Sequence, residues 1–221
     1  MKVILFGATG MVGQGALREC LLDPQVQGVL AVGRSGTGQS HERLREIVHT
    51  DLLDLSPIED KLSGHDACFF CLGASSAGMT EEAYSRVTYD ITMAVAQTLV
   101  RRNRDITFIF VSGAGTDSTE RGRTMWAGVK GKTENALLRL PFKAAYMFRP
   151  AIILPLHGIT SRTRVYRVLY SVFRPLWLLL RALVPRYVTT TEEVGRAMLE
   201  VAKQGAPKSV LESEDIRALG T

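Results

Sequence analysis

The sequence predicts an α/β fold in which one parallel sheet is covered by helices on both sides. Short runs that are apolar throughout alternate with longer stretches whose apolar positions have helical spacing. Strands without a polar face are typical of a parallel sheet buried on both sides. A turn with three glycines follows the first run, and the 221 residues, 46% hydrophobic and 22% charged, suffice for one well-buried domain.

Predicted strands and helices alternate along the first two thirds of the chain. The runs that we predict as strands are residues 2–6, 28–32, 46–50, 66–72, 106–111 and 144–148. Helical spacing covers residues 11–22, 81–102 and 125–140, and Asp23 and Pro24 end the first of these helices. Right-handed crossovers then predict a doubly wound sheet in the strand order 3-2-1-4-5-6.

The alternation stops after Pro150. Residues 151–188 are rich in proline, arginine and bulky apolar residues, and we predict that they form a small lobe over the carboxyl edge of the sheet, within a single domain spanning residues 1–221. A last helix is predicted over residues 191–203, because Thr190 can cap it and two glutamates stand in its first turn.

The predicted lobe contains a basic ridge. Arg167, Arg174 and Arg181 recur every seven residues, and no acidic residue occurs between 158 and 191. The apolar side of such a helix would cover a small-molecule substrate cleft or a subunit interface, and the alternatives are a membrane surface or an acidic partner bound through residues 162–186. We predict neither a membrane span, because no uncharged run there is long enough, nor nucleic-acid binding, because no stacking platform or DNA-binding motif accompanies the arginines.

The glycine turn predicts a dinucleotide site. Gly7, Gly10 and Gly13 have the spacing G-x-x-G-x-x-G between a predicted strand and a predicted helix. In a Rossmann fold the first glycine permits a tight turn, the second lets backbone N–H groups approach the pyrophosphate, and the third lets the helix lie close to the strand. The intervening residues Thr9, Met11 and Val12 are predicted to bind the cofactor with them.

The end of the second predicted strand favours NADP(H) over NAD(H). An acidic residue there would accept hydrogen bonds from the ribose 2′-hydroxyl, whereas this chain has Arg34 and Ser35, which suit a 2′-phosphate. Asp51 follows the third predicted strand. Its position allows either a contact to the adenine amino group or a role in forming a turn.

The chain resembles a known family in several of these segments. They are GATGMVG, GRS, TDLLD, FCLGAS, VSGAG, FRPAIILP and the W-x-x-x-K of Trp126 and Lys130. Together they resemble the atypical, epimerase-like short-chain dehydrogenase/reductases, and within them the small NAD(P)H-binding group that includes the tat-interacting proteins. The resemblance covers nearly the whole chain, and it implies these cofactor ligands: Gly7, Gly10 and Gly13 for the pyrophosphate, Arg34 for the 2′-phosphate, Asp51 and Leu52 for the adenine, and Leu72, Gly73 and Ala74 beside the nicotinamide ribose.

The resemblance also implies where a reaction would occur, and one group departs from the pattern. The family uses a serine and a Tyr-x-x-x-Lys pair; Ser112 and Lys130 stand at the serine and lysine positions, but Trp126 replaces the tyrosine. An indole N–H cannot act as the general acid or base near neutral pH. Lys130 is still implied as a ligand of the nicotinamide ribose, while Ser112 would either orient a carbonyl or simply end its strand.

Two functions remain open at this level. One is an NADP(H)-dependent oxidoreductase or epimerase-like enzyme with a different proton donor. That donor would be water, a residue of the lobe, or Tyr84 or Tyr89 if these two are not packing residues. The other is a non-catalytic NADPH-binding sensor or scaffold. The N-terminus lacks a signal-peptide pattern, and three cysteines are too few for a disulfide framework, so we predict a cytoplasmic location. We predict no metal site, because Cys68 and Cys71 have no second ligand pair.

Overall fold

The computed structural model describes residues 1–159 and 184–221, and it contains one large parallel sheet. Seven strands pair in the order β3-β2-β1-β4-β5-β6-β9, so the predicted order 3-2-1-4-5-6 is confirmed and one strand is added at its end. The strands are β1 (Lys2–Phe6), β2 (Gly28–Gly33), β3 (Leu44–Val48), β4 (Ala67–Phe70), β5 (Thr107–Val111), β6 (Ala144–Arg149) and β9 (Val210–Glu212).

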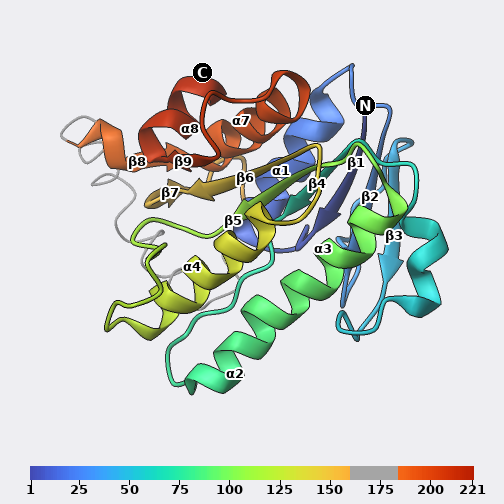
Figure 1. Cartoon of the computed structure of the whole chain (residues 1–221). Helices are drawn as coiled ribbons and strands as arrows, with labels where there is room; N and C mark the ends of the chain where they lie inside the picture. The colour runs from blue at the N-terminus through green and yellow to red at the C-terminus, as the bar shows by residue number, and fades with distance from the viewer. Residues whose placement is uncertain (160–183) are drawn as a thin grey trace.

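Helices cover both faces of this sheet (Figure 1). Helices α1 (Met11–Leu22), α7 (Thr191–Gln204) and α8 (Ser213–Gly220) bury their apolar side chains on one face, where Val3 and Leu5 of β1 point. The opposite face, with Ile4 and Phe6, is covered by η1 (Ser56–Leu62), α3 (Ile91–Arg102) and α4 (Met125–Leu138). The alternation of β1 side chains between two apolar layers explains why the strand has no polar face.

Most predicted boundaries lie within two residues of those observed, and two elements differ from the prediction. The predicted helix 81–102 is continuous but divides into α2 (Glu81–Ser85), the π-helical turn η2 (Arg86–Asp90) and α3. Strand β3 begins and ends two residues earlier than predicted, because its pairing with β2, from Leu44 opposite Val29 to Val48 opposite Gly33, fixes its ends. It is a half-exposed edge strand, so apolar residues mark its limits poorly.

The C-terminal segment contains elements that the sequence did not predict. Strand β9 and helix α8 complete one edge of the sheet, and β7 (Ile152–Leu154) pairs in parallel with β8 (Val188–Thr190), which follows the short helix η3 (Pro185–Tyr187). The predicted cap of α7 is confirmed, because the Thr190 side chain accepts from the Glu193 N–H and the Glu193 carboxylate accepts from the Thr190 N–H.

The predicted lobe 151–188 lies mostly outside the described residues. The ridge arginines at 167, 174 and 181 are among residues 160–183, whereas β7 and β8 bring the two flanks of that segment together. In the two described ranges, no helix has the length and apolar character that crossing a membrane requires.

Candidate functional site

The glycine turn has the geometry that its spacing predicted. Gly7 follows β1 with a φ of +83°, and a Cβ atom there would lie 2.7 Å from the backbone carbon of Cys71. A Cβ atom on Gly13 would lie 2.1 Å from the Gly7 carbonyl oxygen, so α1 could not pack this closely with any other residue. The Gly7 oxygen also accepts from the Gly10 N–H at 2.9 Å. Helix α1 therefore starts at the turn, with its N-terminal N–H groups beside the end of β1.

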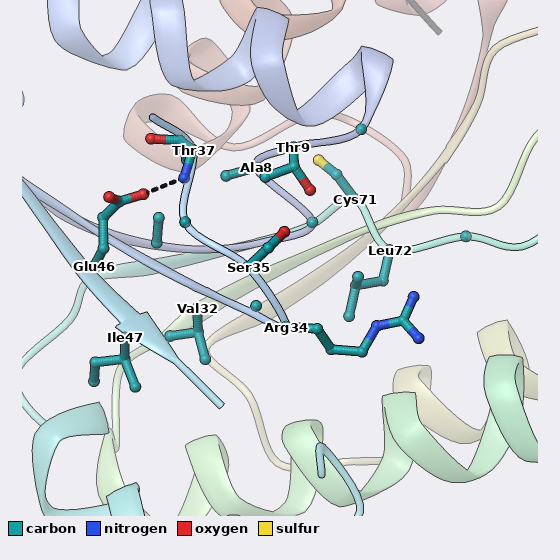
Figure 2. A pocket seen from close by; sticks show the side chains of 16 residues that line it. Ala8, Thr9, Val32, Arg34, Ser35, Thr37, Glu46, Ile47, Cys71 and Leu72 are labelled. Atoms are coloured by element: carbon teal, nitrogen blue, oxygen red, sulfur yellow. Dashed lines mark hydrogen bonds between the residues drawn. The ribbon is translucent and has the colours of Figure 1, made fainter. Parts of the chain in front are cut away.

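A cavity of about 140 Å³ opens at this turn, where the carboxyl ends of the neighbouring strands meet (Figure 2). Its lining residues come from the glycine turn, the end of β2 with its following loop, β3, and the end of β4; they are Gly7, Ala8, Thr9, Gly10, Ala31, Val32, Gly33, Arg34, Ser35, Gly36, Thr37, Glu46, Ile47, Cys71, Leu72 and Gly73. Ligands of open α/β sheets bind at this edge. The enclosed volume is below that of a typical small-molecule pocket, so it suits only part of a dinucleotide.

Arg34 and Ser35 lie in the loop that follows β2, and both line the cavity. Arg34 is exposed, and the structure gives it no ion pair with any residue in the described ranges. Its guanidinium is therefore available to an anionic group.

The adenine ligands implied by the resemblance lie outside the cavity lining. Asp51 is exposed, and its Oδ1 accepts from the Leu53 N–H at 3.0 Å, which is the turn-forming arrangement. Leu52 is 4% exposed and belongs to the core, so only its backbone could meet a ligand. The adenine contact of both residues stays a prediction.

The remaining predicted ligands divide between the cavity and its margins. Leu72 and Gly73 line the cavity, whereas Ala74 is exposed beyond it. Met11 and Val12 pack against the core from the first turn of α1 and can offer the cofactor their backbone rather than their side chains.

Ser112 is buried in a polar network that the sequence did not reveal. Its side chain is 1% exposed, and its Oγ donates to the Glu134 carboxylate at 2.5 Å. Glu134, also 1% exposed, accepts from Arg149 Nε at 3.0 Å and pairs with it through a second nitrogen. The hydrogen bond to Glu134 raises the pKa of Arg149. Of the two roles left open for Ser112, this geometry favours the structural one, because its hydroxyl joins β5 to α4 and β6.

Lys130 and Trp126 lie on consecutive turns of α4, and Lys130 contacts Ser112. The Lys130 ammonium donates to the Ser112 carbonyl oxygen, and its Nζ lies 5.8 Å from the centre of the indole ring of Trp126. Burial lowers the pKa of Lys130, while the charge of Glu134 acts in the opposite direction. The tip of the indole reaches Gly115, where a Cβ atom would lie 3.2 Å from it. The fold thus brings the three predicted positions together at the end of β5.

Neither candidate for a displaced proton donor lines the cavity. Tyr84 is 1% exposed, and burial raises its pKa, which makes it a poor proton donor at neutral pH. The ring of Tyr89 lies under the ammonium of Lys132, with 4.4 Å from Nζ to the ring centre. Both tyrosines occupy packing positions on the helix formed by α2, η2 and α3.

The three cysteines are free; Cys68 lies in the apolar layer under α3 and α4, whereas Cys71 packs against the opposite layer, under α1. Burial raises the pKa of all three thiols. No group of metal-ligating side chains occurs among residues 1–159 and 184–221.

These features define a class of protein. A glycine turn between a parallel strand and a helix, with a cavity over the carboxyl ends of the central strands, is the arrangement of dinucleotide-binding Rossmann domains. A family model described as NAD(P)H-binding matches residues 7–139, more than half of the chain. The chain therefore belongs to this NAD(P)H-binding family, and the atypical short-chain dehydrogenase/reductase character implied by the resemblance is confirmed.

Two curated relatives place the chain more closely. Protein HTATIP2 of Rattus norvegicus is 26% identical over 156 residues, 69% of this chain and 63% of its own length. The chain thus matches less than two thirds of that relative. Protein FMP52-2, mitochondrial, of Scheffersomyces stipitis is 26% identical over 212 residues, 94% of this chain and 90% of its own length. The names of these relatives state no reaction.

Solved structures of low sequence identity share the fold. Gre2 of Candida albicans, in complex with NADPH, has a TM-score of 0.72 at 14% identity and covers 96% of this chain and 77% of its own. MoeE5, in complex with UDP-glucose and NAD, has a TM-score of 0.68 at 19% identity and covers 96% of this chain and 75% of its own. The fold is therefore shared with proteins whose structures hold either cofactor.

Proposed function

We propose that this protein binds NADP(H) in preference to NAD(H). The pyrophosphate would lie at Gly7 to Gly13, on the N-terminus of α1, and the 2′-phosphate at Arg34 and Ser35. The observation that carries the preference is Arg34, an exposed guanidinium at the end of β2 without an ion pair in the described part of the chain. The structural neighbours do not decide the preference, because Gre2 was solved with NADPH and MoeE5 with NAD.

Calorimetry with both reduced cofactors tests the preference. We expect NADPH to bind more tightly than NADH, and we expect Arg34→Asp to remove the difference by losing a charge-assisted pair with the 2′-phosphate. Arg45→Asp is a matched control, because Arg45 is an exposed arginine of β3 that does not line the cavity. Equal affinities of the wild-type protein for the two cofactors would contradict the proposal.

We further propose that the protein acts as an NADPH-binding module without the carbonyl chemistry of its family. Two features at one site support this: Trp126 stands where a phenol would donate the proton, and the hydroxyl of Ser112 is buried against Glu134. When hydride reaches a carbonyl, negative charge develops on the oxygen, and general acid catalysis is typically worth about 10²- to 10⁴-fold in rate. An indole N–H can donate a hydrogen bond to that oxygen, but it cannot transfer its proton near neutral pH.

A single substitution tests this second proposal. We expect the wild-type protein to oxidise NADPH very slowly with generic aldehydes and ketones, and Trp126→Tyr to raise the rate, because Lys130 already lies one turn away. Trp126→Phe is the matched control, since it also replaces the indole by a smaller ring but adds no hydroxyl. Rapid turnover by the wild type that persists in Trp126→Phe would contradict the proposal and establish another donor.

The position of Lys130 favours an oxidoreductase as the second candidate function. Lys130 keeps the position that the family uses, its pKa is lowered by burial, and it lies between the end of β5 and Trp126. A small-molecule substrate or a partner would then meet residues 162–186, of which 162–183 lie outside the described residues. The cytoplasmic location also stays a prediction, since the FMP52 relatives carry the word mitochondrial in their names.

A further inference from the structure

The wall of the cavity carries a carboxylate that sequence reasoning missed. Glu46, in the middle of β3, is one of the lining residues, together with Arg34 to Thr37 of the loop after β2. Its Oε1 accepts a hydrogen bond from the backbone N–H of Thr37 at 2.7 Å, and its Oε2 would lie 3.5 Å from a Cβ atom on Gly36. The Glu46 carboxylate is thus hydrogen-bonded to the same loop that we propose to bind the 2′-phosphate.

The sheet register explains how a residue of the third strand reaches this loop. Glu46 pairs with Ala31 of β2, whose side chain belongs to the core layer under α1. Because side chains alternate along a strand, Glu46 points to that same layer, whereas its neighbour Ile47 packs in the opposite one. The loop after β2 turns back over this face, and its Thr37 N–H meets the carboxylate (Figure 2).

Glu46 and Arg34 present opposite charges to the same cavity without neutralising each other. Figure 2 shows the Arg34 side chain extending away from Glu46, toward Leu72. Neither residue has an ion pair within residues 1–159 and 184–221. An incoming 2′-phosphate would therefore be attracted by one side of the cavity and repelled by the other, while an uncharged 2′-hydroxyl would feel neither effect strongly.

We propose that Glu46 is a specificity-determining residue, which opposes the 2′-phosphate and limits the preference for NADP(H) that Arg34 confers. This inference rests on the proposed cofactor site. In NAD-binding Rossmann sites an acidic residue stands at the end of the second strand. Here the acidic residue comes from β3, and we propose that the site therefore also accepts NAD(H), more weakly than NADP(H). A carboxylate within several ångströms of a phosphate in partly exposed surroundings changes its affinity on the order of three- to tenfold at low salt.

The decisive variant is Glu46→Gln, since the amide oxygen can still accept from the Thr37 N–H while the charge is gone. Glu42→Gln is the matched control, because Glu42 is exposed, lies four residues earlier, and does not line the cavity. Calorimetry would compare 2′,5′-ADP with 5′-ADP, which differ only in the 2′-phosphate, and then NADPH with NADH. Circular dichroism would verify that each variant is folded.

We expect Glu46→Gln to bind 2′,5′-ADP and NADPH about three- to tenfold more tightly than the wild type, with 5′-ADP and NADH changed less than about twofold. The gain should shrink as salt is raised. Unchanged or weaker binding of 2′,5′-ADP by Glu46→Gln, or an equal gain in Glu42→Gln, would overturn the inference and leave the proposed cofactor site intact. A wild-type protein that binds none of the four nucleotides would overturn the proposed function and the inference with it.

Discussion

Replacing Gly13 by alanine should drive α1 away from β1. The new Cβ atom would lie 2.1 Å from the Gly7 oxygen, 2.7 Å from the Gly7 carbonyl carbon and 2.9 Å from the Ala8 Cα. All three atoms are backbone, so no flexible side chain can yield, and the helix or the turn must shift by more than an ångström to reach ordinary contact. Forcing a methyl group into such a site costs about 1–3 kcal/mol.

That cost should appear in both stability and binding. For a domain of this size, 1 kcal/mol corresponds to roughly 2–4 °C in Tm, so we expect Gly13→Ala to lower the Tm by about 2–12 °C. The same shift moves the N–H groups of α1 away from the proposed pyrophosphate position. Losing one such hydrogen bond to a charged group weakens NADPH binding about tenfold or more.

Gly10→Ala is the matched control for this experiment. The atom nearest to a Cβ on Gly10 is the Gly7 oxygen at 3.3 Å, and the Gly10 φ is −79°, so alanine fits with a small adjustment. Its Tm should stay within about 2 °C of the wild type, while its affinity for NADPH falls, because the methyl group occupies the place where the pyrophosphate approaches the backbone. A wild-type Tm for Gly13→Ala would refute the close packing, and a lowered Tm with unchanged NADPH affinity would refute the position of the pyrophosphate.

Three further outcomes follow from the same geometry. Arg34→Asp should weaken NADPH binding about 10- to 100-fold and leave NADH nearly unchanged, and calorimetry that shows equal losses for both cofactors would speak against a 2′-phosphate contact. Glu134→Leu leaves Arg149 without its buried partner and should destabilise the protein by about 3 kcal/mol, seen as a Tm lower by roughly 6–12 °C; an unchanged Tm would show that the pair is dispensable. The Cys20 and Cys68 thiols should react with a disulfide reagent at pH 7.5 only after unfolding, because both are fully buried and burial raises their pKa values; rapid labelling of more than one thiol in the native protein would contradict their placement.

The fold was predictable because its signals are local. Each buried strand is apolar over a run of four to six residues, and each helix shows its spacing within its own segment. Once strands and helices alternate, the handedness of crossovers leaves few topologies, and the order 3-2-1-4-5-6 follows. Strand β9 escaped prediction, because only Leu211 of its three residues is buried and so short a run has no recognisable period.

The glycine turn was predictable for a similar reason. The positive φ of Gly7 and the close approach of α1 at Gly13 are backbone requirements that only glycine meets. The spacing of Gly7, Gly10 and Gly13 in the sequence therefore reveals the turn. The role of Arg34 could also be predicted from its position, because it follows the second predicted strand directly. The absence of a phenol at position 126 could be read from the sequence as well.

Only the tertiary structure decided which of these side chains face the cavity and which are hydrogen-bonded to other groups of the protein. Ser112 meets Glu134 from a different element, 22 residues away, and the carboxylate of Glu46 reaches Thr37 only because the loop after β2 folds back over the third strand. Such pairs depend on the register of the sheet and on the direction in which each side chain leaves its backbone. Spacing along the chain encodes which element a residue belongs to, but two side chains on separate elements meet only when packing sets their relative position, and that position is a property of the whole fold.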